Sequence, residues 1–230
     1  MNVAVVTFPG SNCDDDCHYV CRSVFGATTI QVWHKEKSLP SGVDVVILPG
    51  GFSYGDYLRT GALARFSPIM EDVVRFAGRG GTVLGICNGF QILCEAGLLP
   101  GALIRNQSLR FICESVPVRV ETTDSQLTSA LEKGRVLHIP IAHMDGNYFA
   151  NEDTVHGLED SDQVLLRYCT SAGDVSDTSN PNGSCANIAG IMNSGRNVFG
   201  MMPHPERASE TPLSSIDGRE LLAGLLGGTL

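Results

Sequence analysis

The sequence of 230 residues has few of the features that mark nucleic-acid-binding, membrane-spanning or nucleotide-binding proteins. Its 16 lysines and arginines are outnumbered by 25 aspartates and glutamates, and the net charge of −9 argues against nonspecific nucleic-acid binding, which needs a basic surface. No apolar run approaches the length of a membrane span. The chain also lacks a G-x-x-x-x-G-K-S/T phosphate loop and a G-x-G-x-x-G fingerprint. We therefore expect it to bind neither ATP nor a dinucleotide.

Export signals and a disulfide pattern are missing as well. The first residues lack a basic start and the apolar core of a signal peptide, and eight cysteines are too sparse for a disulfide scaffold. We therefore expect reduced thiols and a cytoplasmic location. Cys13, Cys17 and Cys21 recur every four residues with His18 nearby, which leaves a metal cluster open. The better fit is the apolar face of one helix, for which we predict Cys17, Val20, Cys21, Val24 and Phe25 and no metal.

Strand and helix patterns alternate over the first half of the chain. Apolar runs predict strands at 2–8, 28–33, 43–48 and 83–86, and other patterns predict helices at 69–77 and from the N-cap Asn12 to Gly26. The alternation predicts an α/β fold with a mostly parallel, doubly wound sheet, with the wholly apolar run 43–48 near its centre. Ligands of such sheets bind at the carboxyl ends of the strands. The loops after Leu48 and Ile86 should therefore meet.

The second half of the chain has a different pattern. Short strand-like runs separated by turn residues predict hairpins or a small antiparallel extension, at 116–120, 136–141, 164–168, 189–192 and 197–201. Ala172–Ser184 is rich in Ser, Asp, Asn, Gly and Pro and is predicted to be a loop, and a last helix is predicted at about 218–226. No repeat or linker divides the chain, so we expect residues 1–230 to form a single domain.

The most informative stretch is Gly-Ile-Cys-Asn-Gly at 85–89, with Cys87 at its centre. The apolar run 82–86 leads into it and the helix-like run 90–95 leads out, which is the pattern of a nucleophile elbow with cysteine in place of serine. A Cβ at either glycine would collide with the backbone of such a turn, and the first amides of the helix favour a thiolate. Taken alone, Cys87 fits a buried core cysteine equally well.

The second half of the catalytic argument is Met-Pro-His-Pro-Glu-Arg at 202–207. A cysteine nucleophile needs a histidine that is distant in sequence but close in space, and a carboxylate that orients it. Pro205 favours extended geometry at His204, and positions two apart in an extended segment share a face. We therefore predict Cys87, His204 and Glu206 as the catalytic residues, rather than a loop histidine between two prolines.

A cysteine, histidine and glutamate with a second glycine-rich loop suit acyl transfer from an amide. The tetrahedral oxyanion needs two N–H donors, and we predict one from the amide of Asn88 and one from the loop of Gly51 and Phe52. An ordinary strand-end turn is the alternative for that loop. Gln91 follows Cys87 by one helical turn and can face the same pocket. The predicted oxyanion and substrate-binding residues are therefore Gly51, Phe52, Asn88 and Gln91.

These segments together resemble the class I, or triad, glutamine amidotransferases. The resemblance is carried by Pro-Gly-Gly-Phe-Ser-Tyr-Gly-Asp at 49–56, Gly-Ile-Cys-Asn-Gly-Phe-Gln at 85–91 and Pro-His-Pro-Glu-Arg at 203–207. Further stretches resemble the glutaminase subunits of a purine-biosynthetic synthetase, among them 8–14, 59–66, 98–102 and 110–113. The resemblance therefore spans nearly the whole chain.

The resemblance implies that this chain hydrolyses glutamine to glutamate and ammonia through a γ-glutamyl thioester on Cys87. The ammonia would pass to a separate large synthetase subunit, which uses ATP and Mg to activate a formamide oxygen of a purine precursor. A small third subunit would complete the complex, and no cofactor is expected on this chain. Residues 144–147 and the loop 172–182 depart from the family's pattern, and this departure concerns the substrate side of the site, near His143.

Other functions stay open at this point. The chain could serve a different ammonia-using synthetase, or it could be a cysteine-elbow hydrolase, deglycase, chaperone or peptidase of the related α/β class. Those sites usually place the supporting histidine next to or shortly after the cysteine, where this chain has Asn88. A non-catalytic subunit is a third possibility, and loss of a catalytic residue would signal it. Since Cys87, His204 and Glu206 are all present, we predict the amidotransferase.

Overall fold

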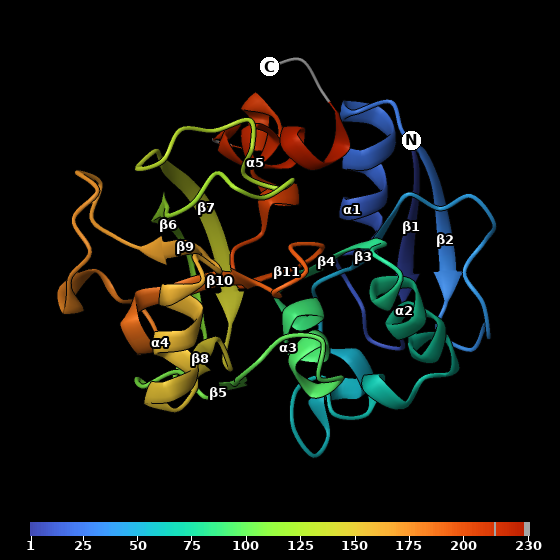
Figure 1. Cartoon of the computed structure of the whole chain (residues 1–230), viewed down its shortest axis with the longest axis horizontal. Helices are drawn as coiled ribbons and strands as arrows, with labels where there is room; N and C mark the ends of the chain where they lie inside the picture. The colour runs from blue at the N-terminus through green and yellow to red at the C-terminus, as the bar shows by residue number, and fades with distance from the viewer. Residues whose placement is uncertain (214, 228–230) are drawn as a thin grey trace.

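The computed structural model describes residues 1–213 and 215–227 and contains two sheets with helices around them (Figure 1). The strands are β1 (Asn2–Thr7), β2 (Thr28–Trp33), β3 (Val45–Leu48), β4 (Thr82–Ile86), β5 (Ala102–Ile104), β6 (Ile112–Val120), β7 (Val136–His143), β8 (Asn147–Phe149), β9 (Val164–Tyr168), β10 (Ile188–Met192) and β11 (Val198–Met201). The helices are α1 (Asp14–Tyr19), which continues as a π-helical turn (Val20–Val24), α2 (Pro68–Gly78), α3 (Asn88–Glu95), α4 (Glu152–Asp160) and α5 (Asp217–Leu226).

The larger sheet has nine strands in the order β2-β1-β3-β4-β11-β10-β9-β6-β7. The pairs from β2 to β11 are parallel, and those from β11 through β10, β9 and β6 to β7 are antiparallel. This order confirms the predicted α/β fold with an antiparallel extension. All four residues of β3 are buried, as expected for a strand between parallel neighbours.

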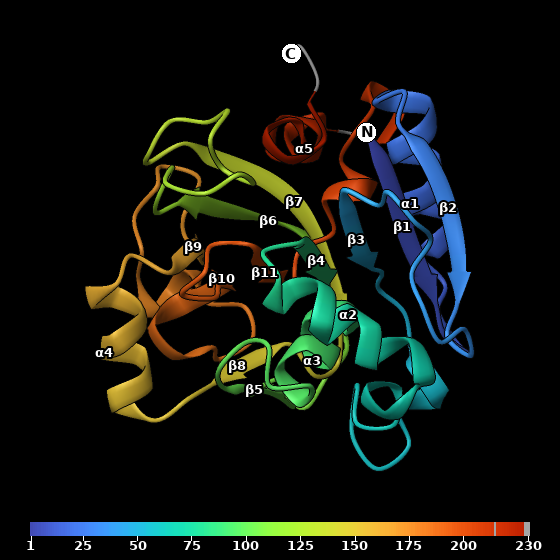
Figure 2. The ribbon, with the colours of Figure 1, turned by 45° about the vertical axis from the view of Figure 1, so that its right-hand side comes forward.

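Helices cover both faces of the parallel part of the sheet. Figures 1 and 2 show α2 and α3 on one face and α1 on the other, while α5 packs against β7 and the turn that follows β11. The apolar face predicted for the first helix packs into the core through Cys17, Val20 and Cys21, each at most 2% exposed. Those two cysteines therefore serve packing. The helix has no side-chain cap: it begins after Cys13, and the predicted cap Asn12 instead accepts a contact from the Cys13 thiol at 3.3 Å.

The strand predicted at 197–201 has one pairing that was expected and one that was not. It forms an antiparallel hairpin with β10, as predicted, and on its other side it pairs in parallel with β4. Every residue of β11 is buried, and a short run that is apolar on both faces is typical of the centre of a parallel sheet. The strands β5 and β8, which form the second sheet, and the helix α4 were not predicted.

The topology brings two loops together at the carboxyl end of the sheet. The chain crosses from β1 to β2 on one side and from β3 to β4 on the other, and such a reversal of direction opens a ligand crevice at the strand ends. Gly51, after β3, forms an isolated bridge with Ser11, after β1. The site described below lies at this edge.

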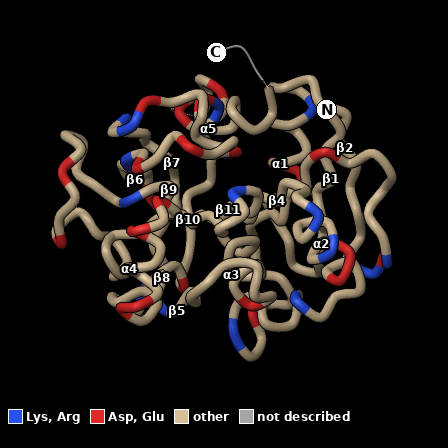
Figure 3. The backbone as a smooth tube through the Cα atoms, viewed as in Figure 1, with Lys and Arg blue, Asp and Glu red and all other residues tan. Residues whose placement is uncertain are grey.

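The distribution of charged residues and the lengths of the helices agree with what the sequence composition predicts. Lysines and arginines are interspersed with aspartates and glutamates along the backbone in Figure 3 rather than gathered on one side. Among the described residues, none of the helices has the length and apolar content needed to span a membrane.

Candidate active site

Cys87 lies on a strained turn between β4 and α3. It is the residue before the helix and has φ +50° and ψ −103°, a combination that few residues other than glycine adopt. Backbone strain of this kind costs about 1–3 kcal/mol and persists only where the surroundings enforce it. The thiol is 4% exposed, and its Sγ lies 3.8 Å from the carbonyl oxygen of Ala142. The geometry is that of the predicted nucleophile elbow.

The glycines on either side of Cys87 allow this turn to pack. A Cβ on Gly89 would overlap the carbonyl oxygen of Leu48, so only glycine lets α3 approach the end of β3 this closely. A Cβ on Gly85 would lie 2.6 Å from the carbonyl carbon of Gly89. Both contacts are with rigid backbone, which cannot move aside as a flexible side chain could. The crowding predicted for the two positions is therefore present.

The register of β11 against β4 places His204 beside Cys87. Met201 is paired with Ile86, and the amide of Cys87 donates to the carbonyl oxygen of Met201 at 2.7 Å. Since parallel strands end at the same edge, the residues after β11 emerge next to the elbow. The amide of His204 donates to Pro140 O of β7 at 2.8 Å, which fixes the approach of the ring.

His204 and Glu206 form a buried hydrogen-bonded pair. Nδ1 of His204 lies 2.6 Å from Oε1 of Glu206, and both residues are at most 2% exposed. The predicted geometry was wrong in one respect: the segment is not extended, and Pro205–Arg207 forms a 3-10 turn that brings the carboxylate back to the ring. Proline fits the first position of such a turn because its φ is already suitable.

The surroundings of His204 act on its pKa in opposite directions. Burial alone lowers this pKa, whereas the Glu206 carboxylate and the thiols of Cys87 and Cys13 raise it, so that the net pKa is well above the ordinary value. With Nδ1 bonded to Glu206, Nε2 is the ring nitrogen left free, and it has no hydrogen-bond partner among the described residues. The ring can therefore exchange a proton through Nε2.

The predicted oxyanion loop lies against the elbow, but its two residues differ. The amide of Phe52 already donates to the carbonyl oxygen of Gly10 at 2.9 Å. Gly51, with φ +137°, has an amide that no hydrogen bond engages within the described part of the chain. Asn88 is the first residue of α3, where the amide has no acceptor inside the helix. Gly51 and Asn88 are therefore the better-placed donors.

The side chains of Asn88 and Gln91 connect the loops around the pocket. Oδ1 of Asn88 accepts from the amide of Ser53 at 3.1 Å, and its Nδ2 donates to Oε1 of Gln91 at 2.7 Å. Nε2 of Gln91 in turn donates to the carbonyl oxygen of Asp145 at 2.7 Å. Gln91 lines the pocket as predicted, although both ends of its amide are already engaged.

The pocket at Cys87 is small, at about 20 Å³. It brings together the predicted Gly51, Phe52, Cys87 and Gln91, and it is also lined by Asp56, Thr60, Ala142, His143, Met144 and Asp145. Residues 143–147 were expected on the substrate side of the site, and His143 and Asp145 lie there, whereas Asp56 had no predicted role of its own. Asp56 and Asp145 lie in the loops that follow β3 and β7. An acidic residue in a loop at the carboxyl end of a strand is the sequence feature that could have identified them as site residues.

Cys13, the residue before the first helix, lies close to His204 and Glu206. Sγ of Cys13 is 3.1 Å from Nη2 of Arg207, whose Nε is 3.1 Å from Oδ2 of Asp16. Cys13, His204 and Glu206 place one potential ligand atom each within 4.8 Å of one another. Because Nδ1 of His204 is hydrogen-bonded to Glu206, we interpret this arrangement as support for the histidine rather than as a metal centre.

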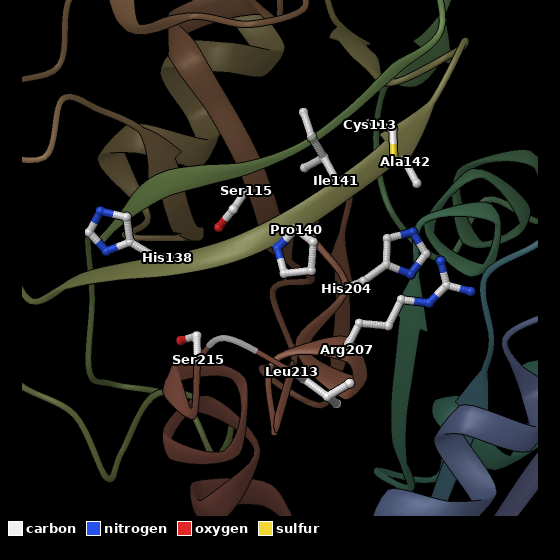
Figure 4. Close-up of a pocket in the computed structure, with 10 residues that line it drawn as sticks. All are labelled: Cys113, Ser115, His138, Pro140, Ile141, Ala142, His204, Arg207, Leu213 and Ser215. Carbon is white, nitrogen blue, oxygen red and sulfur yellow. The ribbon is translucent and has the colours of Figure 1, made fainter. Parts of the chain in front are cut away.

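A larger pocket, of about 370 Å³, lies on the other side of His204 (Figure 4). It runs between β7 and the segment that follows β11, with His138 and Ser115 at one end and His204 and Arg207 at the other. Cys87 does not line it. The chemistry therefore belongs to the smaller pocket.

The long polar loop is anchored to the substrate side of the site. Asn182 is fully buried, and its Nδ2 donates to Gly146 O at 2.8 Å and to the hydroxyl of Tyr168 at 3.2 Å. The hydroxyl of Ser184 donates to Oδ1 of Asn182 at 2.8 Å. Residues 144–147 and the loop 172–184 thus hold each other in place.

Comparisons with known proteins agree with this geometry. A profile of the CobB/CobQ-like glutamine amidotransferase domain matches residues 1–220. The chain is 58% identical over 222 residues to phosphoribosylformylglycinamidine synthase subunit PurQ of Salinibacter ruber, covering 96% of this chain and 94% of that one. It is 53% identical to the same subunit of Koribacter versatilis, covering 99% and 98%. Among solved structures it resembles a chain of PurLQS from Thermotoga maritima, with a TM-score of 0.86, 44% identity and coverage of 98% and 97%.

Proposed function

Because this chain belongs to the CobB/CobQ-like glutamine amidotransferase family, we propose that it is the glutaminase subunit of phosphoribosylformylglycinamidine synthase. In this function it hydrolyses glutamine and delivers ammonia to a synthetase subunit. That subunit uses ATP and Mg to convert formylglycinamide ribonucleotide to formylglycinamidine ribonucleotide in purine biosynthesis. The observation that carries the proposal is Cys87, held on a strained turn beside the buried pair of His204 and Glu206.

The first half of the reaction forms a thioester. Nε2 of His204 takes the proton of Cys87, and the thiolate attacks the side-chain amide carbon of glutamine. The amides of Gly51 and Asn88 donate to the oxyanion that develops. His204 then gives its proton to the departing nitrogen, so that ammonia leaves and a γ-glutamyl thioester remains on Cys87.

The second half regenerates the enzyme. His204 takes a proton from a water molecule, which attacks the thioester carbon, and the collapse of the second oxyanion releases glutamate and the Cys87 thiolate. Glu206 accepts the Nδ1–H of His204, keeps the ring in the productive tautomer and stabilises the imidazolium in both halves. Apart from water and glutamine, each step uses only side chains and main-chain amides of this chain.

The partners and the organisation follow from the same proposal. The synthetase subunit and a small third subunit assemble with this chain, as the name PurLQS suggests for the complex from Thermotoga maritima. ATP and Mg belong to the synthetase, residues 1–230 form one domain without a cofactor, and the complex is cytoplasmic. The PurQ relatives, at 53–58% identity over nearly the full chain, favour this synthetase over a different ammonia-using one.

A thiol-labelling experiment tests the nucleophile. The full chain is treated with 6-diazo-5-oxo-norleucine, an electrophilic glutamine analogue, and the labelled peptide is mapped by mass spectrometry. We expect a single label on Cys87 and none in Cys87→Ser. Cys113→Ser is the matched control, because Cys113 is the exposed cysteine of the chain and its removal should not alter labelling. Label on Cys13, Cys94 or Cys113 in place of Cys87 would refute the assignment.

A further inference from the structure

The small pocket at Cys87 is lined by hydrogen-bond acceptors and by no lysine or arginine among the described residues. The residues that line it include two acids, Asp56 and Asp145, and the imidazole of His143. Glutamine has one cationic group, the α-ammonium, which carries three N–H donors. The composition of the pocket therefore matches that end of the substrate better than the α-carboxylate.

Asp56 has an unused carboxylate oxygen in this pocket. Oδ1 is shielded from solvent and has no hydrogen-bond partner among the described residues. Leaving such an atom buried and unpartnered costs free energy, so it needs a compensating partner when the enzyme works. The backbone holds Asp56 at φ +54°, in a turn where Tyr54 and Leu58 also have positive φ. The loop thus accepts strain that keeps the carboxylate in the pocket.

His143 presents a second unused acceptor. Nδ2 of Asn106 donates to the carbonyl oxygens of Arg110 and His143, both at 2.9 Å, which fixes the orientation of its amide. Oδ1 of Asn106, which also accepts from Gly146 N, then accepts the Nδ1–H of His143 at 3.1 Å. Nε2 of His143 is therefore an unprotonated acceptor. His143 is only 3% exposed, and no partner of Nε2 is found in the part of the chain that the structure describes.

The burial of His143 and the charges around Asp56 are consistent with a neutral imidazole and with a pocket that favours a cation. Burial, with a smaller contribution from His204, lowers the pKa of His143 to about 4, so the ring is uncharged at neutral pH. Burial and the nearby Asp145 raise the pKa of Asp56 to about 6. A cation placed between these groups would relieve the repulsion between the two carboxylates.

Asp145 completes the set of acceptors that line the pocket. Its carbonyl oxygen is held by Gln91, and its carboxylate lies 3.6 Å from Nε of Arg105, which does not line the pocket. We propose that Asp56, Asp145 and Nε2 of His143 form the subsite that binds the α-ammonium of glutamine and so select an α-amino acid amide. This inference rests on the glutaminase function proposed above. Free ammonium has the same chemistry, and the test separates the two.

The test removes the ammonium from the substrate and the carboxylate from the enzyme in turn. The chain, assembled with its synthetase partners, is assayed with glutamine and with glutaramate, which is glutamine without its α-amino group. For the wild type we expect kcat/KM to be about 100-fold higher for glutamine, since hydrogen bonds to charged groups are among the strongest. Asp56→Asn should lower kcat/KM for glutamine by about 10- to 100-fold, mainly through KM, and leave glutaramate unchanged within about 3-fold.

Three controls make the result specific. Asp160→Asn removes an exposed carboxylate of α4 and should retain the preference for glutamine. Iodoacetamide, which carries no ammonium, should alkylate Cys87 at the same rate in the wild type and in Asp56→Asn. Asp145→Asn repeats the experiment on the other acid of the pocket, in case Asp56→Asn does not fold. We expect it to reduce the preference in the same direction.

The outcomes are distinguishable. If Asp56→Asn and Asp145→Asn both keep the full preference for glutamine over glutaramate, the inference is wrong. An equal loss with both substrates, together with slower iodoacetamide alkylation, would also overturn it, because the carboxylate would then act on the thiol or the fold. If ammonium chloride inhibits the enzyme while Asp56→Asn keeps the preference for glutamine over glutaramate, the inference is also wrong, and the subsite binds the ammonium product instead. A wild-type complex without any glutaminase activity would contradict the proposed function itself.

Discussion

Asp56 shows how function and stability oppose each other at a single residue. Its pKa is about 6 in the folded chain, against an ordinary value of 3.8. An acid with a raised pKa destabilises the fold above its folded pKa, and the penalty declines progressively as the pH falls from about 6 to the ordinary value of 3.8. The difference between these two pKa values corresponds to about 3 kcal/mol in full burial, and to about 1–2 kcal/mol for Asp56, which is only partly buried.

We therefore expect Asp56→Asn to stabilise the free chain by about 1–2 kcal/mol at pH 7.5 and by almost nothing at pH 4. Urea denaturation of both chains at several pH values between 4 and 8 measures the difference. The other groups that face this pocket, Asp145, His143 and Cys87, and Arg105 behind Asp145, are present in both chains. A stability difference that does not change with pH would contradict the prediction.

Gly89 sets the distance between the elbow helix and the sheet. Gly89→Ala would place a methyl group on the Leu48 carbonyl oxygen, which belongs to a central strand and cannot move aside. We expect a loss of more than about 3 kcal/mol in unfolding free energy, at the upper end of overpacking effects. Gly78→Ala is the matched control: it ends α2 with open space around it and should be neutral or stabilising by up to about 1 kcal/mol. Equal stabilities of the two variants would refute this account.

At the scale of elements, the sequence predicts strands formed by long apolar runs, but it does not predict strands that depend on contacts between distant segments of the chain. The strand at 164–168 was predicted with its observed ends, because five largely buried residues lie between turn residues. The short strands β5 and β8, of three residues each, exist only because they pair with each other, which no local pattern encodes. The helix α4 had a missed signal: Asn151 accepts from the amide of Thr154, a regular N-cap followed by two acids.

The residues of the candidate site likewise fall into those that the sequence predicts and those that it does not. Cys87 and His204 were predictable because glycines and prolines mark their turns in the sequence. The roles of Asp56 and His143 depend on which atoms stay unpartnered after folding, and this is a property of the assembled loops. The 3-10 turn at Pro205–Arg207 was missed because the sequence suits both extended and turn geometry.

The loop 172–184 is the element whose anchoring can be tested most directly. Asn182→Ala would remove the donor to the Tyr168 hydroxyl and leave Gly146 O with only the longer contact from the Ser184 hydroxyl at 3.4 Å. We expect a loss of about 2–4 kcal/mol in unfolding free energy and a higher KM for glutamine, because Gly146 adjoins Asp145. Thr178→Ala, on the exposed part of the same loop, should change stability by less than about 0.5 kcal/mol. Chemical denaturation and steady-state glutaminase kinetics measure both effects; an unchanged KM in Asn182→Ala would separate the loop from the site.

At the scale of the whole molecule, the closed pocket has a functional consequence. A cavity of about 20 Å³ has room for about one water molecule, whereas the thioester mechanism requires the glutamine side chain beside Cys87. The segment from Phe52 to Thr60 forms one wall, and its outer side carries Tyr57 and Leu58 at 74% and 88% exposure. Large apolar side chains exposed this fully are typical of surfaces that contact another protein. We infer that the isolated chain is mostly in a closed, poorly active state.

We therefore expect glutaminase turnover of the isolated chain to rise by at least about 10-fold when the synthetase and the small third subunit are added, since a binding-competent state populated at 10% or less gives this factor. Ammonia release is measured at saturating glutamine and again at low glutamine, so that effects on kcat and KM are separated. Tyr57→Ser/Leu58→Ser should retain the basal rate and lose much of the stimulation, while Leu213→Ser, which changes an exposed leucine away from this wall, should retain both. Equal turnover with and without the partner chains would show that the closed pocket opens freely and that the partners do not control it.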